Sequence, residues 1–156
     1  MPAIEQARTI LDSLLGYLGF VVRIDEENGP EGPTLQIHSE DHDALIGRRG
    51  EVLDDIQYLT NRILQRREPG APRVRVDCEF FRTMREDRLL DRVKEQAERV
   101  RASGHPIQLQ PLNSYYRRLV HNLFVEDPTI QSVSEGGDGR FKRITLKKRS
   151  EPKASA

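Results

Sequence analysis

The chain has 156 residues, of which 36% are hydrophobic and 32% are charged, and its formal net charge is zero. This length accommodates one ordinary domain or two small domains, and neutrality argues against a protein that coats nucleic acid indiscriminately. Cys78 is the single cysteine, so an internal disulfide and a cysteine-rich zinc site are excluded, and a reducing cytoplasm is the expected localisation. We expect no membrane insertion, because the sequence has no run of 18 apolar residues.

The two halves of the chain differ in charge. Residues 1–80 contain 9 Lys and Arg against 15 Asp and Glu, a net charge of −6. Residues 81–156 contain 16 against 10, a net charge of +6. Opposite charges predict two modules, and the basic second half is the better partner for a polyanion.

The first half alternates between the periodicities of helices and strands. Turn-forming residues separate the first two strands, and the Pro-Gly segment over 69–72 ends the longest helix. The predicted elements are a helix over 3–18, strands around 20–24, 35–37 and 74–80, a short apolar segment over 44–46, and a strong amphipathic helix from Glu51 to about residue 67.

The second half begins with a strongly charged segment that has only a narrow apolar stripe, which predicts a long exposed helix joining two modules. After it we expect strands around 107–110, 130–133 and 141–146 and a helix from about residue 114 to 124. The expected organisation is therefore α+β, with a first domain over 1–80, a linker helix over 81–104, a second domain over 105–149 and a flexible tail over 150–156.

The segment Gly47-Arg48-Arg49-Gly50 separates the short apolar segment from the strong helix. Glycine at both ends lets the backbone turn sharply and lets a nucleic-acid backbone approach closely. Amides at the start of the helix can point at phosphate oxygens, and the two arginines add positive charge. The alternative interpretation of this segment is an ordinary corner between helices with two solvated arginines.

The order of elements and the segment from Leu45 to Leu53 resemble a KH (K homology) domain of the bacterial type II kind. Such domains use their Gly-x-x-Gly loop to clamp about four nucleotides of a single strand. The resemblance implies RNA binding by Gly47, Arg48, Arg49 and Gly50. It also makes Ile46, Val52 and Ile56 candidates for an apolar floor under the bases, although all three could equally be core residues.

Arg117 and His121 lie four residues apart on a predicted helix and therefore share a face. Arginine can donate a fork of hydrogen bonds to a phosphate, and histidine can stack on a base or donate to a phosphate. The segments around them resemble the RxxxH domain, a module that binds single-stranded nucleic acid. Further basic residues nearby would provide a positive field around the pair, and their alternative interpretation is a solvated basic surface. The residues of this kind that we expect to bind RNA are Arg118, Arg140, Lys142 and Arg143.

A KH domain followed by an RxxxH domain is similar to the Jag family, also called KhpB or SpoIIIJ-associated proteins, over residues 3–149. The chain opens on the KH-type helix, so we expect it to lack the N-terminal Jag domain of many relatives. Tyr116 also departs from the pattern, because relatives often carry Glu there. The family implies a non-enzymatic RNA-binding protein without cofactor or metal, acting as a post-transcriptional regulator or RNA chaperone. Expected partners are single-stranded RNA and either a second small KH protein or a second copy of the chain.

Three other functions compete with this interpretation. An enzyme or metal site would have to use His38, His42 and Cys78 with nearby aspartates, but these residues lack a recognised ligand spacing. A protein-interaction adaptor could dock through the charged helix and the acidic first half. Single-stranded DNA could replace RNA, because the RxxxH module accepts either.

Overall fold

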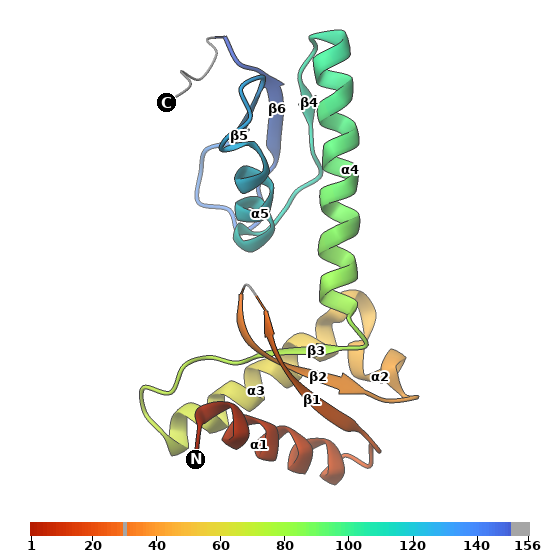
Figure 1. Cartoon of the computed structure of the whole chain (residues 1–156), viewed down its shortest axis with the longest axis vertical. Coiled ribbons are helices and arrows are strands. Elements are labelled where there is room, and N and C mark those ends of the chain that lie inside the picture. Colours follow the sequence, from red (N-terminus) through yellow and green to blue (C-terminus); the bar gives the residue numbers. More distant parts are fainter. Residues whose placement is uncertain (30, 151–156) are drawn as a thin grey trace. The chain divides into compact units, whose positions relative to one another are not determined.

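A computed structural model describes residues 1–29 and 31–150 (Figure 1). It contains both helices and small sheets, which confirms the mixed character of the expected α+β class. The chain divides into two compact units, Met1–Met84 and Arg85–Ala156. The division falls inside the segment that we expected to be a linker helix, and apart from residue 150 the expected flexible tail lies outside the described residues.

The first unit has the predicted order of elements. A three-residue 3-10 turn joins its second and third helices. The elements are α1 (Ala3–Tyr17), β1 (Arg23–Gly29), β2 (Gly32–His38), α2 (His42–Ile46), the turn η1 (Arg48–Gly50), α3 (Glu51–Arg67) and β3 (Arg75–Cys78).

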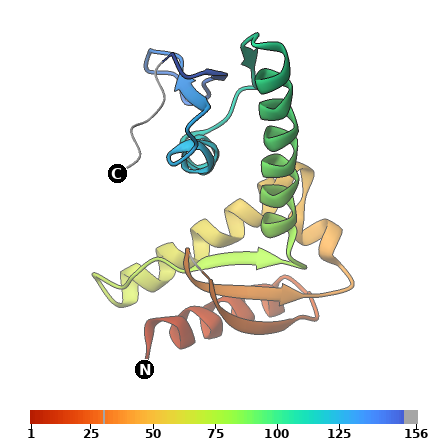
Figure 2. The same ribbon diagram turned by 45° about the horizontal axis from the view of Figure 1, so that its top comes forward.

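The three strands of this unit form one mixed sheet in the order β1-β2-β3. Strand β2 pairs antiparallel with β1 and parallel with β3. Helices α1 and α3 lie side by side along the sheet (Figures 1 and 2). The apolar faces of both helices pack on the strands, and burying them supplies the main driving force for this fold. Fully buried members of the core include Leu11, Leu15, Leu35, Ile37, Leu53, Leu64 and Val76.

Strand β1 starts later than predicted. Phe20 and Val22 pack against the core and Val21 between them is exposed, but the strand itself begins at Arg23 and continues through the acidic residues that follow. Strand β1 is an edge strand, and charged side chains are well tolerated there because they face water. The apolar alternation therefore marked the approach to the strand and its beginning, where Ile24 is buried.

The opposite edge of the sheet is closed by side chains of α3. Asn61 is buried, donates through Nδ2 to the carbonyl oxygen of Val74 at 2.7 Å, and accepts from the amide of Val74 at 2.8 Å. Gln57 accepts the amide of Val76 at 2.9 Å. These bonds replace the strand partner that β3 lacks on this side, so the edge keeps no open row of amides for another chain.

We expect Asn61→Ala to lower the free energy of unfolding by about 2–4 kcal/mol, because both backbone groups of Val74 would be buried without partners. Urea denaturation followed by circular dichroism measures this change. Gln65→Ala, one turn further along α3, is the matched control and should cost less than about 1 kcal/mol because Gln65 is only partly buried. Equal losses in the two variants would contradict the role assigned to Asn61.

The second unit is built on an antiparallel sheet. The strand order is β4-β6-β5, with β6 in the middle. Helix α4 begins in the first unit and continues into the second. The elements are α4 (Phe81–Ser103), β4 (Ile107–Gln108), α5 (Ser114–Phe124), β5 (Ile130–Ser134) and β6 (Ile144–Lys148).

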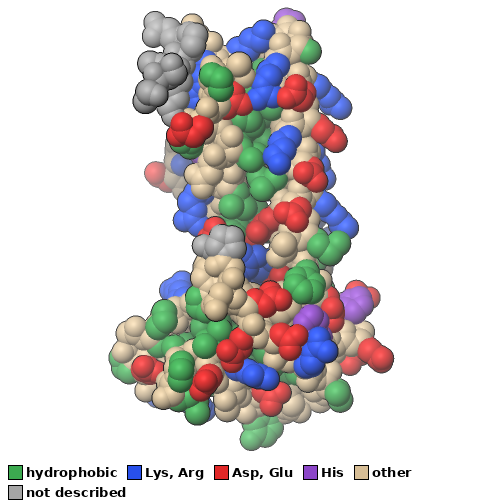
Figure 3. All heavy atoms as spheres, in the orientation of Figure 1, with side chains coloured by type: hydrophobic (Ala, Val, Ile, Leu, Met, Phe, Trp, Pro, Cys, Tyr) green, Lys and Arg blue, Asp and Glu red, His purple; other side chains and the backbone are tan. Residues whose placement is uncertain are grey.

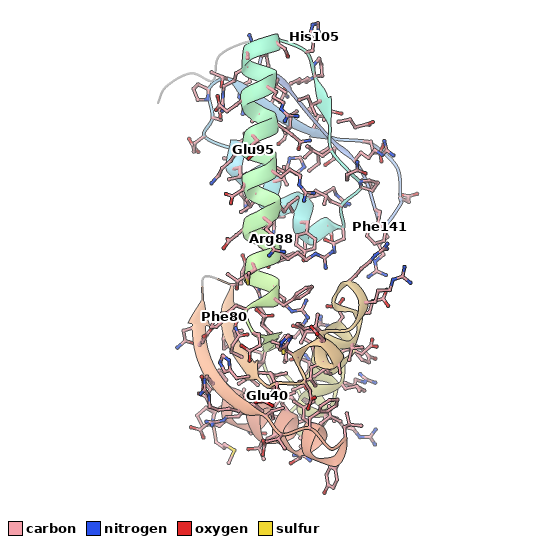
Figure 4. All side chains as sticks on the ribbon, turned by 90° about the vertical axis from the view of Figure 1, so that its right-hand side faces the viewer. Glu40, Phe80, Arg88, Glu95, His105 and Phe141 are labelled. Carbon is pink, nitrogen blue, oxygen red and sulfur yellow. The ribbon has the colours of Figure 1, made fainter. Side chains whose placement is uncertain are left out.

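Helix α4 is not exposed along its whole length, and our expectation is wrong in this respect. Val93, Ala97 and Val100 are at most 1% exposed and belong to one core with residues of α5, β5 and β6. The stripe is narrow because its residues are small, which lets the helix lie close to its neighbours. The charged side chains Arg88 and Glu95, labelled in Figure 4, lie on the exposed surface of the helix.

Strand β6 is shorter than predicted. It begins at Ile144, so Phe141 stays outside the strand, 58% exposed. Ile144 and Leu146 alternate into the core as expected. Within the described ranges, 1–29 and 31–150, no helix has the length and apolar character needed to cross a membrane.

Candidate nucleic-acid interface

The glycine loop, residues Gly47 to Gly50, connects α2 to α3 by a left-handed turn. Gly47 has φ 72° and ψ −174°, Arg49 has φ 56°, and Gly50 has φ 80°. The amide of Gly50 donates to the carbonyl oxygen of Gly47 at 3.4 Å. The amide of Gly47 donates to the carbonyl oxygen of Asp43 at 2.9 Å. Three positive φ angles among four residues give the sharp turn that joins the two helices.

Neither glycine of the loop can be replaced without a clash. A Cβ atom on Gly47 would lie 2.8 Å from Cβ of Val52 and also against its Cγ2. A Cβ atom on Gly50 would lie 2.8 Å from Cε1 of Phe81. The left-handed φ angles would add strain to any other L-residue. Close packing and backbone conformation therefore both require glycine at these two positions.

The loop presents positive charge beside the amides that begin a helix. Arg48 and Arg49 are exposed, whereas Gly50 is buried. Helix α3 starts without a side-chain cap, so amides of its first turn lack a side-chain acceptor. Such amides and the positive end of the helix dipole favour an anion. Glu51 and Asp54 in the same turn oppose this effect in part, so the arginines are needed to make the loop attractive to phosphate.

The three apolar candidates beside the loop occupy different environments. Ile56 is 5% exposed and belongs to the core of the first unit. Ile46 is partly buried and packs against the same core. Val52 is 40% exposed and lies directly against Gly47. Of these three, Val52 has the most surface available to a ligand.

A groove between α3 and β3, which our sequence reasoning missed, has a volume of about 430 Å³. Tyr58, 66% exposed, and Arg62 contribute from the helix, and Arg73 and Arg75 contribute from the strand side. An exposed aromatic ring can stack on a base, and arginines can attract its phosphate. The parallel pairing of β3 with β2 and the bonds from Asn61 and Gln57 bring the two segments together, so no local pattern indicated the groove.

The second candidate site lies on α5, where Asn113 caps the helix by accepting the amide of Tyr116 at 3.0 Å. Arg117 and His121 do share a face of this helix, but both are engaged within the unit. Nη1 of Arg117 donates to the carbonyl oxygens of Leu112 at 2.6 Å and Arg140 at 3.3 Å. The guanidinium therefore ties the start of α5 to the loop between β5 and β6.

His121 bridges two hydroxyl groups of strand β5. Its Nδ1 lies 2.6 Å from Oγ of Ser132 and its Nε2 lies 2.8 Å from Oγ of Ser134. Burial and the neighbouring charge of Arg117 lower the pKa of His121 below its ordinary value. A neutral imidazole has one donor and one acceptor nitrogen, so one serine accepts from the ring and the other donates to it.

The remaining basic candidates surround this helix and the following loop. Arg118 and Arg140 are exposed, and each lies near an aromatic ring, Tyr115 at 5.5 Å and Phe141 at 5.6 Å respectively. Lys142 is partly buried. On the face drawn in Figure 3, Lys and Arg side chains are interspersed with Asp and Glu rather than gathered into one patch. The surface shown there favours local contacts over a broad positive field.

The residues considered for a metal or hydrolytic site do not assemble into one. His38 lies 3.2 Å from Asp25 and 3.3 Å from Glu79, whereas His42 pairs with its neighbour Asp43. Cys78 is buried, and burial raises the pKa of its thiol to about 12. Among the described residues, no cluster of three His, Cys, Asp or Glu side chains has an arrangement that could hold a metal ion.

We expect His121 to make the second unit less stable in mild acid. Its pKa is lower in the folded chain than its ordinary 6.5, so the unfolded chain binds the proton more readily. Neutral His121 therefore stabilises the folded chain fully above the ordinary pKa of 6.5. The free energy of unfolding decreases as the pH falls below 6.5, because protonation then favours the unfolded chain. Thermal unfolding between about pH 7.5 and 5 should show a decline in the wild type that His121→Gln reduces. His105→Gln, at an exposed position, is the control and should retain the decline.

Part of the chain matches a known domain family. Residues 87–148, which include Arg117 and His121, match the R-3-H domain. This match starts within α4, in agreement with the burial of the apolar stripe of that helix in the second unit.

Three curated relatives resemble most of the chain, and each is called RNA-binding protein KhpB. The protein from Clostridium symbiosum is 27% identical over 147 residues, covering 92% of this chain and 66% of the relative. The Bacillus subtilis (strain 168) protein is 27% identical over 148 residues, covering 93% and 71%. The Lactiplantibacillus plantarum protein is 26% identical over 134 residues, covering 84% and 42%. The chain thus matches just under two thirds of the first relative's length, and the matches support the Jag/KhpB family.

Proposed function

We propose that this chain, which resembles the KhpB proteins and matches the R-3-H domain in its second half, binds single-stranded RNA without catalysing a reaction. The observation that carries the proposal is the glycine loop, where left-handed backbone, exposed arginines and uncapped amides occur together. A phosphate backbone can approach such a loop closely because no Cβ atom stands in its way.

We propose further that the first unit is a KH domain of type II. Its observed order of helix, two strands, short helix, glycine loop, long helix and strand supports this assignment. A domain of this kind holds about four nucleotides. The groove between α3 and β3 begins one turn beyond the loop, at Asp54, and continues along the helix to Gln65. In this proposal the loop holds the sugar–phosphate backbone, and the groove receives the bases.

In the second unit, direct contacts with RNA come from exposed basic residues rather than from the Arg117 and His121 pair alone. The hydrogen bonds described above for this pair are to groups of the same unit. Their role in this proposal is to hold α5, strand β5 and the following loop together. Arg118, Arg140 and Arg143 are exposed and supply positive charge around them.

A second candidate function is protein docking, in a cytoplasmic post-transcriptional regulator or RNA chaperone that pairs with another small KH protein or with its own copy. Tyr17, Leu18 and Val21 are 92%, 61% and 87% exposed at the end of α1. A cluster of exposed apolar residues favours a protein contact. Sedimentation equilibrium of the wild type and of Val21→Asp tests this candidate, and a monomeric wild type would exclude self-association.

Reversing the charge of the glycine loop should abolish most RNA binding. We expect the double variant R48D/R49D to fold normally, because both side chains are exposed, and to bind RNA at least about tenfold more weakly. Fluorescence anisotropy with a labelled single-stranded RNA measures the affinity, and circular dichroism checks the fold. Competition with DNA of the same sequence distinguishes RNA from DNA binding, because only RNA carries the 2′-hydroxyl.

The variant R66D/R67D is a matched control, because it makes the same charge change on exposed arginines at the far end of α3. Contact with four phosphates of a single strand gives a slope of about −3 for the logarithm of affinity against that of salt concentration. The loop variant should reduce this slope by about 1.4, and the control should leave it unchanged. Equal effects of both variants would refute the role of the loop.

A further inference from the structure

Phe141 is the exposed aromatic residue of the loop between β5 and β6. Its side chain is 58% exposed, and Figure 4 labels it on this connection. Single exposed apolar residues are common on proteins and usually need no explanation. Three further observations distinguish Phe141: the anchoring of its backbone, the cation beside its ring and the charge of its neighbours.

The backbone on both sides of Phe141 is anchored. Lys142 exchanges both of its backbone hydrogen bonds with Leu112, at 3.1 and 2.9 Å. On the other side, the carbonyl oxygen of Arg140 accepts from Arg117 at 3.3 Å. An aromatic ring on an anchored backbone loses little conformational freedom when it binds a ligand, which favours a recognition role.

The immediate surroundings of the ring are cationic. The guanidinium carbon of Arg140 lies 5.6 Å from the ring centroid, within the range of a cation–π interaction. Lys142 and Arg143 follow directly in the chain. An aromatic face beside positive charges is the combination with which proteins bind unpaired nucleotides, since the ring stacks on the base and the cations attract the phosphate.

The two tyrosines of α5 also have an arginine beside the ring, but both are only partly exposed and both are engaged within the unit. The guanidinium of Arg118 lies over the ring of Tyr115 at 5.5 Å, and that of Arg85 lies over Tyr116 at 5.3 Å. The rings contact each other edge to face, and the hydroxyl of Tyr115 donates to Glu86 at 2.8 Å. These rings pack α5 against the part of α4 that belongs to the second unit.

We propose that Phe141, with Arg140 beside it, is a stacking site for one unpaired base of a bound RNA, and that Arg117 is the residue that positions it. This inference rests on the proposed function and deepens it. The ring provides the contact with the base, and Arg117 acts through the backbone of Arg140. The site does not select among the four bases, because every base has a face on which an aromatic ring can stack.

Tryptophan fluorescence tests the contact directly, because the chain contains no tryptophan. The variant F141W carries a reporter at the site, and Y17W carries one at a 92% exposed position of α1. The ligand is a single-stranded RNA of about 12 nucleotides, enough for the roughly four held by the glycine loop and for further bases. We expect this RNA to quench F141W strongly and Y17W little. An abasic sugar–phosphate chain of the same length should quench neither.

Affinity supplies an independent measurement. We expect F141A to weaken binding of the RNA by about 5-fold to 100-fold, the usual loss of one stacked base, and F141W to bind as the wild type does. The control V125A removes an apolar side chain that is 49% exposed in the same unit and should bind normally. The abasic chain should bind F141A and wild type equally, because it has no base to stack.

The outcomes separate the two proposals. If the wild type fails to bind RNA at all, the proposed function itself is wrong. If the wild type binds but F141A binds equally well, or the abasic chain quenches F141W as much as RNA does, the stacking site is wrong and the proposed function stands.

The variant R117K tests the positioning role: it should reduce quenching of the reporter in the R117K/F141W chain while circular dichroism stays unchanged. Full quenching in the R117K/F141W chain would show that Arg117 does not position Phe141, although Phe141 itself would still contact the base.

Discussion

The space between α2 and α3 leaves no room for a side chain at either end of the turn that joins them. Val52 fills the position beside Gly47, and Phe81 fills the position beside Gly50. This constraint fixes more than the turn, because α3 starts there and later covers the edge of the sheet through Asn61. A side chain in place of Gly47 or Gly50 would force Val52 or Phe81 to move. The two glycines that would allow close approach of RNA in the proposed function are thus required by the packing as well.

The two units use their polar residues differently. In the first unit, the arginines of the glycine loop lie at the surface, and Gln57 and Asn61 of α3 bond the edge of the sheet. In the second unit, the paired arginine and histidine of α5 make several hydrogen bonds inside their own unit. A residue pattern that is informative about binding can therefore describe the support of a binding surface rather than the surface itself. Removing such a hydrogen bond lowers the free energy of unfolding, because it leaves a partly buried polar group without a partner.

Much of the fold could be predicted from the sequence, because its main elements have strong periodicity. The helix after Gly50 and the alternation of Ile144 and Leu146 were both identified from apolar spacing. The burial of Val93, Ala97 and Val100 was not, because three small residues among many charges resemble a solvated helix until a partner surface is known. The groove beside β3 and the exposure of Phe141 were also missed, since both depend on strand pairing and strand ends that no local pattern specifies.

The burial of Cys78 gives the chain a natural reporter of its own opening. It is the single thiol of the sequence, it is 0% exposed at the end of β3, and its pKa of about 12 keeps it protonated at neutral pH. A thiol reagent can react only when the sheet of the first unit separates from its helices, because the thiolate is the reactive form and forms readily only in water. The rate of thiol modification therefore measures how often the first unit opens. The second unit does not affect this rate directly, because it contains no cysteine.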